Sequence, residues 1–268
     1  ALSQYEDFEG LATNNQRAGD CRYLVDAVRR YLKGSFVFDP NPKLMRSYER
    51  IADRPLARNG ANLSAVLHAL TVAANGNDGK LDRLLQWIQQ VPEEPYASFG
   101  FVTTELNDVI FGFRQAANGP LLDARVLSDG TLRCLAVLTA LQTAEANSRA
   151  IIEEFDNGLH STRTHVLTQA VTECANQSPL NVLVTTHNPA TLDALTTEQL
   201  DGVVLCAWDG AEHASRLVRL RDLPRFVELV ERGRLGDLVT RKVIDQYLAP
   251  GFEEQRTQKA LKWLEGLS

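Results

Sequence analysis

The chain has 268 residues, and 44% of them are hydrophobic, which is ordinary for a protein with a sizeable core. Its net charge of −6 at pH 7 excludes a global basic field that would attract nucleic acid. The four cysteines lie far apart without a Cys-x-x-Cys pair, which argues against a zinc site or a disulfide scaffold and favours the cytoplasm. No apolar run reaches the roughly 20 residues that a membrane-spanning helix needs, and no signal peptide is visible, so we expect no membrane partner.

The first half of the chain is predicted to combine helices with a few strands. Periodic apolar residues predict helices over three stretches: 1–35, 63–72 and 81–88. The segment Asn59–Asn62 precedes the second of these helices and can cap it. Phe36–Phe38 is a short strand-like run, and residues 97–114 favour strands because they are rich in aromatic and β-branched side chains.

A basic residue recurs every three or four positions between these elements. The series consists of Lys43, Arg46, Arg50, Arg54 and Arg58. Pro55 interrupts any helix there, so only the first part could form one continuous face. Such a face could bind DNA or an acidic partner. We favour a solvated face balanced by Glu49 and Asp53, because the chain is acidic overall.

From residue 127 onward, predicted helices and strands alternate, which indicates a largely parallel sheet with covering helices. The first of these helices follows the sequence Ser128-Asp129-Gly130. Ser128 or Asp129 can cap the helix, and Gly130 lets a phosphate approach the N-terminal amides, which attract anions. A simple helix cap explains the same residues equally well.

The apolar run Ala150–Ile152 predicts a buried strand that ends in Glu153 and Glu154. Adjacent carboxylates on a strand point to opposite faces, so one could face a Mg²⁺-bound water shell and the other an attacking water. The carboxyl ends of strands are also where open α/β sheets bind ligands. A solvated acidic strand end is the weaker interpretation, because a third acid, Asp156, follows.

A further buried strand is predicted over Val182–Val184, with a polar tip and a helix that starts near Pro189. The tip ends in His187, which could hydrogen-bond a phosphate. A single histidine at a strand end is more often structural, so this residue alone indicates little.

Together, the three segments resemble the signature loop, the Walker B strand and the switch histidine of ABC-type ATPases. The closest branch is the RecF-, SMC- and OLD-like one, whose members work on DNA or in phage defence rather than in membranes. The stretch Glu153–His160 resembles that branch's EEPENGLHP segment. Residues 39–46 and 54–63 look like an insertion of predicted ATPases of this group, and Leu235–Leu238 looks like a C-terminal element.

The resemblance implies an α/β fold with an ABC-ATPase-like, mostly parallel sheet and covering helices. Residues 1–120 would form a helical and β insertion, or lid, and residues 121–268 the C-terminal ATPase lobe. The implied cofactors are ATP and Mg²⁺.

The same resemblance implies roles for individual residues. Glu153 would take the Mg²⁺ side, Glu154 would polarise the attacking water, and His187 would sense the γ-phosphate. Nucleotide held by a second subunit would meet the signature loop, which consists of Ser128, Asp129 and Gly130. The subunit interface would include Asn157, Gly158 and His160.

The chain departs from the family pattern in three ways. Phe155 replaces the usual proline, and Asp156 replaces the usual glutamate. The glycine-rich loop ending in Gly-Lys-Ser/Thr, which holds the β- and γ-phosphates, occurs nowhere in the 268 residues. Because the chain opens with Ala1 instead of Met, we expect this loop to lie upstream in the full gene product.

These observations favour the interpretation that the chain is the C-terminal portion of an ATPase. This ATPase would self-associate around ATP and Mg²⁺ and gate a DNA-related or anti-phage activity. Hydrolysis would then need the upstream phosphate loop. An effector protein could act in trans, and any nuclease would be another chain, because no TOPRIM-like or HNH-like cluster is present. The alternative is a non-enzymatic assembly subunit with a vestigial ATPase half, against which the joint presence of Glu153, Glu154 and His187 weighs.

Overall fold

The computed structural model describes residues 15–72, 79–91, 95–145, 147–177, 180–210, 212–249, 251–252, 256–258 and 261–262. The first 14 residues of the helix expected over 1–35 therefore lie outside the described residues. By its internal contacts the chain forms two compact units, residues 1–186 and 187–268. The functional division expected near residue 120 is of a different kind and stays a prediction.

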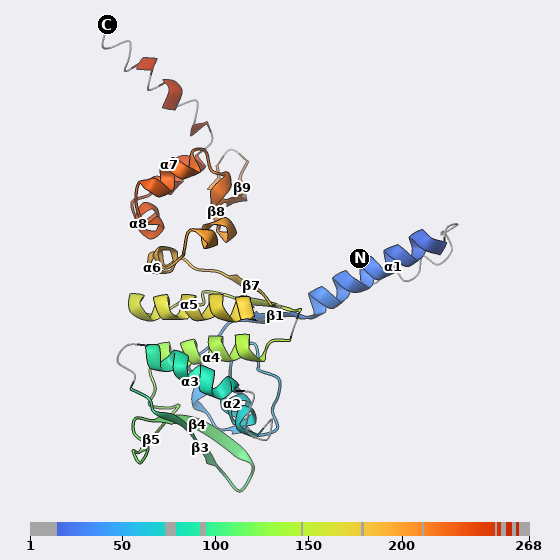
Figure 1. The fold of residues 1–268 in the computed structure, drawn as a ribbon, viewed down its shortest axis with the longest axis vertical. Helices are drawn as coiled ribbons and strands as arrows, with labels where there is room; N and C mark the ends of the chain where they lie inside the picture. Colours follow the sequence, from blue (N-terminus) through green and yellow to red (C-terminus); the bar gives the residue numbers. More distant parts are fainter. Residues whose placement is uncertain are drawn as a thin grey trace. The chain divides into compact units, whose positions relative to one another are not determined.

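The first unit contains a three-stranded parallel sheet in the order β1-β6-β7. Its outer strands, β1 and β7, are labelled in Figure 1. Its strands are β1 (Ser35–Phe38), β6 (Arg149–Ile152) and β7 (Asn181–Val184). Helix α1 (Asn15–Lys33) leads into β1. Phe38 lies opposite Ile152, and Ile152 lies opposite Val184, so all three strands end at the same edge. The expected parallel sheet is thereby confirmed.

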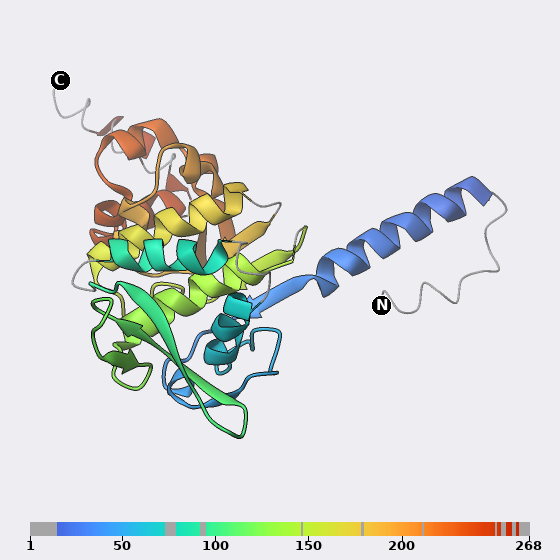
Figure 2. The same cartoon turned by 60° about the horizontal axis from the view of Figure 1, so that its bottom comes forward.

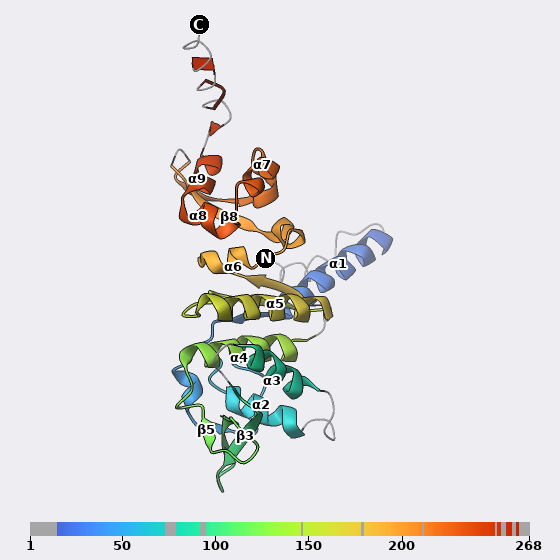
Figure 3. The same ribbon diagram turned by 60° about the vertical axis from the view of Figure 1, so that its left-hand side comes forward.

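Helix α4 (Asp129–Thr143) is the central helix of this unit and lies between α3 and α5 in Figure 3. It contacts β6 and three helices: α2 (Leu63–Val72), α3 (Lys80–Gln90) and α5 (Ser161–Gln177). Apart from Arg133, its residues from Thr131 to Leu141 are buried. A helix that is apolar on nearly all sides needs such surroundings, because each face must be removed from water.

A second, antiparallel sheet contacts α2 through β4, and its green strands lie beside the cyan helix in Figure 2. Its strands are β2 (Glu49–Arg50), β3 (Ser98–Thr103), β4 (Asp108–Arg114) and β5 (Leu121–Asp123), and β4 pairs with the other three. The ring of Tyr96 stacks on Phe113 at a centroid distance of 4.3 Å, and the ring of Phe99 packs against it in a tilted orientation at 4.7 Å. At Gly112 an added Cβ would lie 2.5 Å from the Leu122 carbonyl oxygen, so only glycine lets β5 approach this closely.

The second unit has its own hydrophobic core, which includes Leu220, Leu229 and Ile244. Its helices are α6 (Pro189–Asp193), α7 (Phe226–Glu231), α8 (Leu235–Thr240) and α9 (Val243–Leu248), with short 3-10 turns η3 (Glu198–Gly202) and η4 (Leu220–Asp222). The strand expected after α6 is present as β8 (Val204–Asp209). It pairs antiparallel with β9 (Ala214–Arg219) and is not a strand of the parallel sheet that the alternation predicted.

The expected C-terminal element Leu235–Leu238 begins helix α8, which packs against α6. Gly236 donates its amide to Asp193 Oδ1 at 2.7 Å. A Cβ at Gly236 would collide with the Pro189 carbonyl oxygen, so the glycine permits the close approach of the two helices. Within the described part of the chain, no helix is long and apolar enough to cross a membrane.

Candidate nucleotide site

Ser128 forms the N-cap of helix α4, with extended backbone angles of φ −66° and ψ 152°. Its Oγ accepts a hydrogen bond from the Thr131 amide at 3.1 Å and lies 2.7 Å from Thr131 Oγ1. This pattern is typical of a serine cap, which leaves other first-turn amides available at the positive end of the helix dipole. Of the two caps that the sequence allowed, the structure has Ser128, while Asp129 lies exposed in the first turn.

Arg46 holds the signature loop from the N-terminal side. One of its guanidinium nitrogens, Nη2, donates to the Leu127 carbonyl at 2.8 Å and lies 2.6 Å from Asp129 Oδ1. Its other terminal nitrogen, Nη1, donates to the Pro42 carbonyl at 3.0 Å. Arg46 was expected on a solvated face, so this half-buried contact was missed by the sequence analysis.

The basic series as a whole is not a helical face. Arg46 ends the short 3-10 helix η2 (Leu44–Arg46), and Arg50 lies in strand β2. Lys43, Arg50, Arg54 and Arg58 are exposed, as the solvated interpretation expected. The same interpretation expected Glu49 and Asp53 to balance the basic charges. For Arg50 this was wrong, because Arg50 pairs with Asp108 at 3.2 Å.

Glu49 also differs from the expectation that it would balance the basic series. Burial raises the pKa of Glu49, and the nearby charges of Asp53 and Asp108 raise it further. Arg46 and Arg50 instead pair with Asp129 and Asp108, which are acids from elsewhere in the fold.

Arg163, in the first turn of α5, holds the signature loop from the other side. Its Nη1 lies 3.1 Å from Ser128 Oγ and 3.4 Å from Thr131 Oγ1. A Cβ placed on Gly130 would lie 3.1 Å from the same nitrogen and 3.2 Å from Leu159 Cδ2. The loop therefore packs directly against the start of α5. No sequence pattern predicted this contact.

Glu153 and Glu154 do not continue strand β6, which ends at Ile152. The Glu153 amide still donates to the Phe38 carbonyl at 3.1 Å, but Glu154 has a left-handed backbone with φ 42°. The expectation that both carboxylates alternate across a strand was therefore wrong, because the chain turns at this point. Both side chains are exposed beyond the carboxyl edge of the parallel sheet.

The Glu154 turn is fixed by several hydrogen bonds. Its amide donates to Thr185 Oγ1 at 3.0 Å, and its Oε2 accepts from Asn157 Nδ2 at 2.8 Å. The Glu154 carbonyl accepts from Arg133 Nη1 at 3.4 Å. Arg133 belongs to α4, so the carboxylate turn and the signature helix are in direct contact within one unit.

Phe155 and Asp156, the two substituted residues among the three departures from the family pattern, are both buried. Phe155 is 1% exposed and belongs to the main core. Asp156 is 2% exposed, and its Oδ2 accepts a hydrogen bond from Thr186 Oγ1 at 2.7 Å. Asp156 therefore joins the ends of β6 and β7. The sequence signal for this contact is the polar pair Thr185-Thr186, which directly follows the predicted strand Val182–Val184.

The residues expected at a subunit interface lie on the surface of the following turn. Asn157, Gly158 and His160 are exposed, and Gly158 has φ 73°, which favours glycine. His160 Nδ1 lies 2.8 Å from Thr162 Oγ1. Their role in an interface stays a prediction.

His187 is the first residue of the second unit and follows Thr186 directly. Its side chain is exposed. The next residue, Asn188, caps α6 by accepting the Ala190 amide at 3.0 Å, and Pro189 occupies the first helical position as expected.

The carboxylate turn offers the exposed carboxylates of Glu153 and Glu154 at the carboxyl edge of the parallel sheet. Among the described residues, no group of three or more His, Cys, Asp or Glu side chains could hold a metal ion. Mg²⁺ is usually bound by one or two carboxylates together with phosphates and water. An exposed carboxylate such as Glu153, at the edge of the sheet, suits that coordination.

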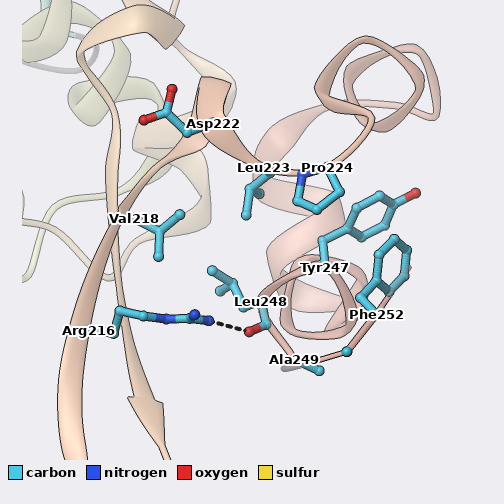
Figure 4. Close-up of a pocket in the computed structure, with 10 residues that line it drawn as sticks. Arg216, Val218, Asp222, Leu223, Pro224, Tyr247, Leu248, Ala249 and Phe252 are labelled. Atoms are coloured by element: carbon cyan, nitrogen blue, oxygen red, sulfur yellow. Dashed lines mark hydrogen bonds between the residues drawn. The ribbon is translucent and has the colours of Figure 1, made fainter. Parts of the chain in front are cut away.

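A cavity of about 340 Å³ lies within the second unit (Figure 4). Much of its lining is apolar, including Val218, Leu223 and Phe252. Arg216 borders it and donates to the Leu248 carbonyl at 2.6 Å.

Comparison with solved structures finds heads of SMC proteins at low similarity. A structure described as "Structural biochemistry of ATP-driven dimerization and DNA stimulated activation of SMC ATPases" is 10% identical, with a TM-score of 0.41, over 58% of this chain and 91% of the other. The Smc head domain with a coiled coil and joint from Pyrococcus yayanosii is 10% identical, with a TM-score of 0.37, over 58% and 29%. The Smc head domain bound to the C-terminal domain of ScpA from Pyrococcus furiosus is 10% identical, with a TM-score of 0.40, over 86% and 50%.

No curated protein matches the chain. A family model does match, over residues 5–193, with the description "AAA domain, putative AbiEii toxin, Type IV TA system". That match covers more than half of the chain and includes both the signature loop and the carboxylate turn. The chain therefore belongs to this AAA-domain family, in agreement with the ATPase resemblance that its sequence showed.

Proposed function

We propose that this chain supplies the signature loop and the hydrolytic carboxylates of an ATPase that closes as a dimer around ATP and Mg²⁺. The observation that supports this best is the direct attachment of the two motifs within one unit. Arg133 links α4 to the Glu154 turn, and Arg163 links α5 to Ser128. Such an arrangement lets a change at either motif move the other.

Each motif has a chemical task in this proposal. The N-terminus of α4, with Ser128, Asp129 and Gly130, would receive the γ-phosphate of nucleotide held by a second subunit. Glu154 would orient and polarise the attacking water, with its carboxylate held by Asn157. Glu153 would bind Mg²⁺, which offsets phosphate charge when bound. His187 would contact the γ-phosphate.

Closure of such a dimer would gate a second activity, because a ligand that binds one conformation better shifts the equilibrium toward it. The matched family's description names a toxin–antitoxin system, which favours a role in anti-phage defence. A DNA-related activity and an effector protein in trans remain part of the proposal. Asn157, Gly158 and His160 would lie in the dimer interface.

The alternative function is an assembly subunit that donates Ser128 and Gly130 to a partner's nucleotide, or binds a partner without nucleotide. The exposed position of Ser128 at the N-terminus of α4 is compatible with this function too.

The two functions are distinguished by measuring ATP binding and hydrolysis. The 268-residue chain is assayed alone and joined to the coding sequence that precedes it in the gene, each with Glu154→Gln. Glu105→Gln, an exposed glutamate in the same unit, is the matched control. Hydrolysis by the extended protein that Glu154→Gln abolishes and Glu105→Gln leaves unchanged supports the ATPase. No nucleotide binding in any form refutes it and favours the assembly subunit.

A further inference from the structure

The hydrogen bonds around Ser128 Oγ decide where its proton can go. A serine hydroxyl has one proton to donate and two lone pairs to accept with. The Thr131 amide and Arg163 Nη1 both donate to this oxygen, each at 3.1 Å, so both lone pairs are occupied. The hydroxyl can therefore only donate its proton to a third group, and Thr131 Oγ1, 2.7 Å away, is within its reach.

This arrangement prepares the hydroxyl to donate to a phosphate oxygen. The proton needs only to rotate from Thr131 Oγ1 to the incoming oxygen, while the two donors keep Ser128 Oγ in place. Without Arg163, one lone pair would be open, and the hydroxyl could accept from water as readily as donate.

Gly130 makes the approach of Arg163 possible. A Cβ at this position would lie 3.1 Å from Arg163 Nη1. The guanidinium therefore occupies space that the side chain of a larger residue would need. Arg163 also lies in the first turn of α5, the helix that directly follows the Glu153–His160 turn. One side chain thus connects the end of the carboxylate turn to the hydroxyl of the signature loop.

We propose that Arg163 is a positioning residue: it holds Ser128 Oγ so that its proton is donated to the phosphate of a nucleotide bound by a second subunit. This inference rests on the proposed ATPase function, and it adds a residue that the family resemblance did not assign. Arg163 acts through Ser128, so the two residues should behave as one unit.

A double-mutant cycle in the ATP-hydrolysing form of the protein tests this coupling. Arg163→Ala should lower kcat roughly 10-fold, the size expected for losing one charge-assisted hydrogen bond, with little change in KM. Ser128→Ala should lower kcat at least as much, and the double variant should be no slower than Ser128→Ala alone. Arg163→Lys, which can still donate one hydrogen bond, should recover part of the rate. Gln169→Ala, an exposed change on the same helix, is the control.

Independent effects that multiply in the double variant, or an Arg163→Ala rate equal to the wild type, would overturn the inference. A second measurement, on the 268-residue chain without nucleotide, does not depend on hydrolysis. Amide exchange at Thr131 should accelerate in Arg163→Ala and stay unchanged in Gln169→Ala, because the Thr131 amide bonds to the oxygen that Arg163 holds. Unchanged exchange in Arg163→Ala refutes the positioning itself. Absence of hydrolysis in every wild-type form refutes the proposed function and, with it, the phosphate role of Ser128.

Discussion

Replacing Gly130 with alanine separates the stability of the signature loop from its function. The glycine lies in the first turn of α4, and the added methyl group would meet Arg163 Nη1 at 3.1 Å and Leu159 Cδ2 at 3.2 Å. Both atoms are the far ends of flexible side chains, so they can move by the few tenths of an ångström required. Arg163 would then move away from Ser128 Oγ.

The two energetic effects of this substitution nearly cancel. Alanine is favoured over glycine in a helix by about 0.8–1.0 kcal/mol. Losing the hydrogen bond between Arg163 and Ser128 costs about 1.5 kcal/mol at the low end for a charged donor, which applies because the pair is partly exposed. The net change in unfolding free energy should therefore stay within about 1 kcal/mol, equivalent to a Tm shift of at most ~4 °C.

Thermal unfolding and steady-state ATP hydrolysis are measured on the same preparations. Gly130→Ala should melt within that range of the wild type and yet hydrolyse ATP at least 10-fold more slowly, because its serine is no longer held. Gly202→Ala is the control, since nothing lies within 4 Å of a Cβ built there. A fully active Gly130→Ala protein would show that the close approach of Arg163 is irrelevant, and a loss of several kcal/mol would show that the loop cannot adjust as argued.

Three further changes test the core and the electrostatics. Thr186→Val removes the hydrogen bond to the buried carboxylate of Asp156 and should destabilise the protein by about 2 kcal/mol in urea unfolding; no loss would mean that this bond is dispensable. Phe155→Ala empties a buried position and should cost about 3–5 kcal/mol in the same assay, so a cost under 1 kcal/mol would contradict its place in the core. Side-chain hydrogen bonds, from Arg256 first, lower the pKa of Glu228 from 4.5 to about 2. A carboxyl pKa that is lower in the folded state contributes stability above the unfolded-state value, and this contribution is lost as the pH falls toward the folded-state value. The Tm advantage of the wild type over Glu228→Gln should therefore shrink between pH 4.5 and about 2, and a constant difference would exclude the linkage.

Local patterns predicted the elements of the fold well where hydrophobic periodicity was strong. The helices over 63–72 and 81–88 appear as α2 and α3 within a residue or two of their expected ends. Asn62 shows where local reasoning stopped. It was expected in a helix cap, but its buried side chain bonds to the Ala57 amide and to the Asp53 and Pro55 carbonyls, and so holds the preceding loop.

The cap at Ser128 and the acids that follow strand β6 could be predicted from the sequence. The contacts that the arginines make with the signature loop could not. Ser128 caps a helix by a rule that depends on neighbours three residues away, so the sequence contains all the information needed. The contact between Arg46 and Leu127 joins residues 81 positions apart, and that between Arg163 and Ser128 joins residues 35 apart. Such pairs follow from packing of the whole unit. The strand rule failed at Glu154 because a positive φ ends the alternation there.

The pairing of Arg46 with Asp129 removes an apparent conflict in the proposed phosphate site. A carboxylate in the first turn of a helix stabilises that helix through the dipole, but it would repel an incoming phosphate. Arg46 Nη2, 2.6 Å from Asp129 Oδ1, offsets that negative charge, and the same nitrogen anchors the loop at Leu127. The positive guanidinium of Arg163 lies on the Ser128 side of the loop. The loop therefore gains the capping benefit of an acid and still presents a serine, a glycine and a cation to an anion.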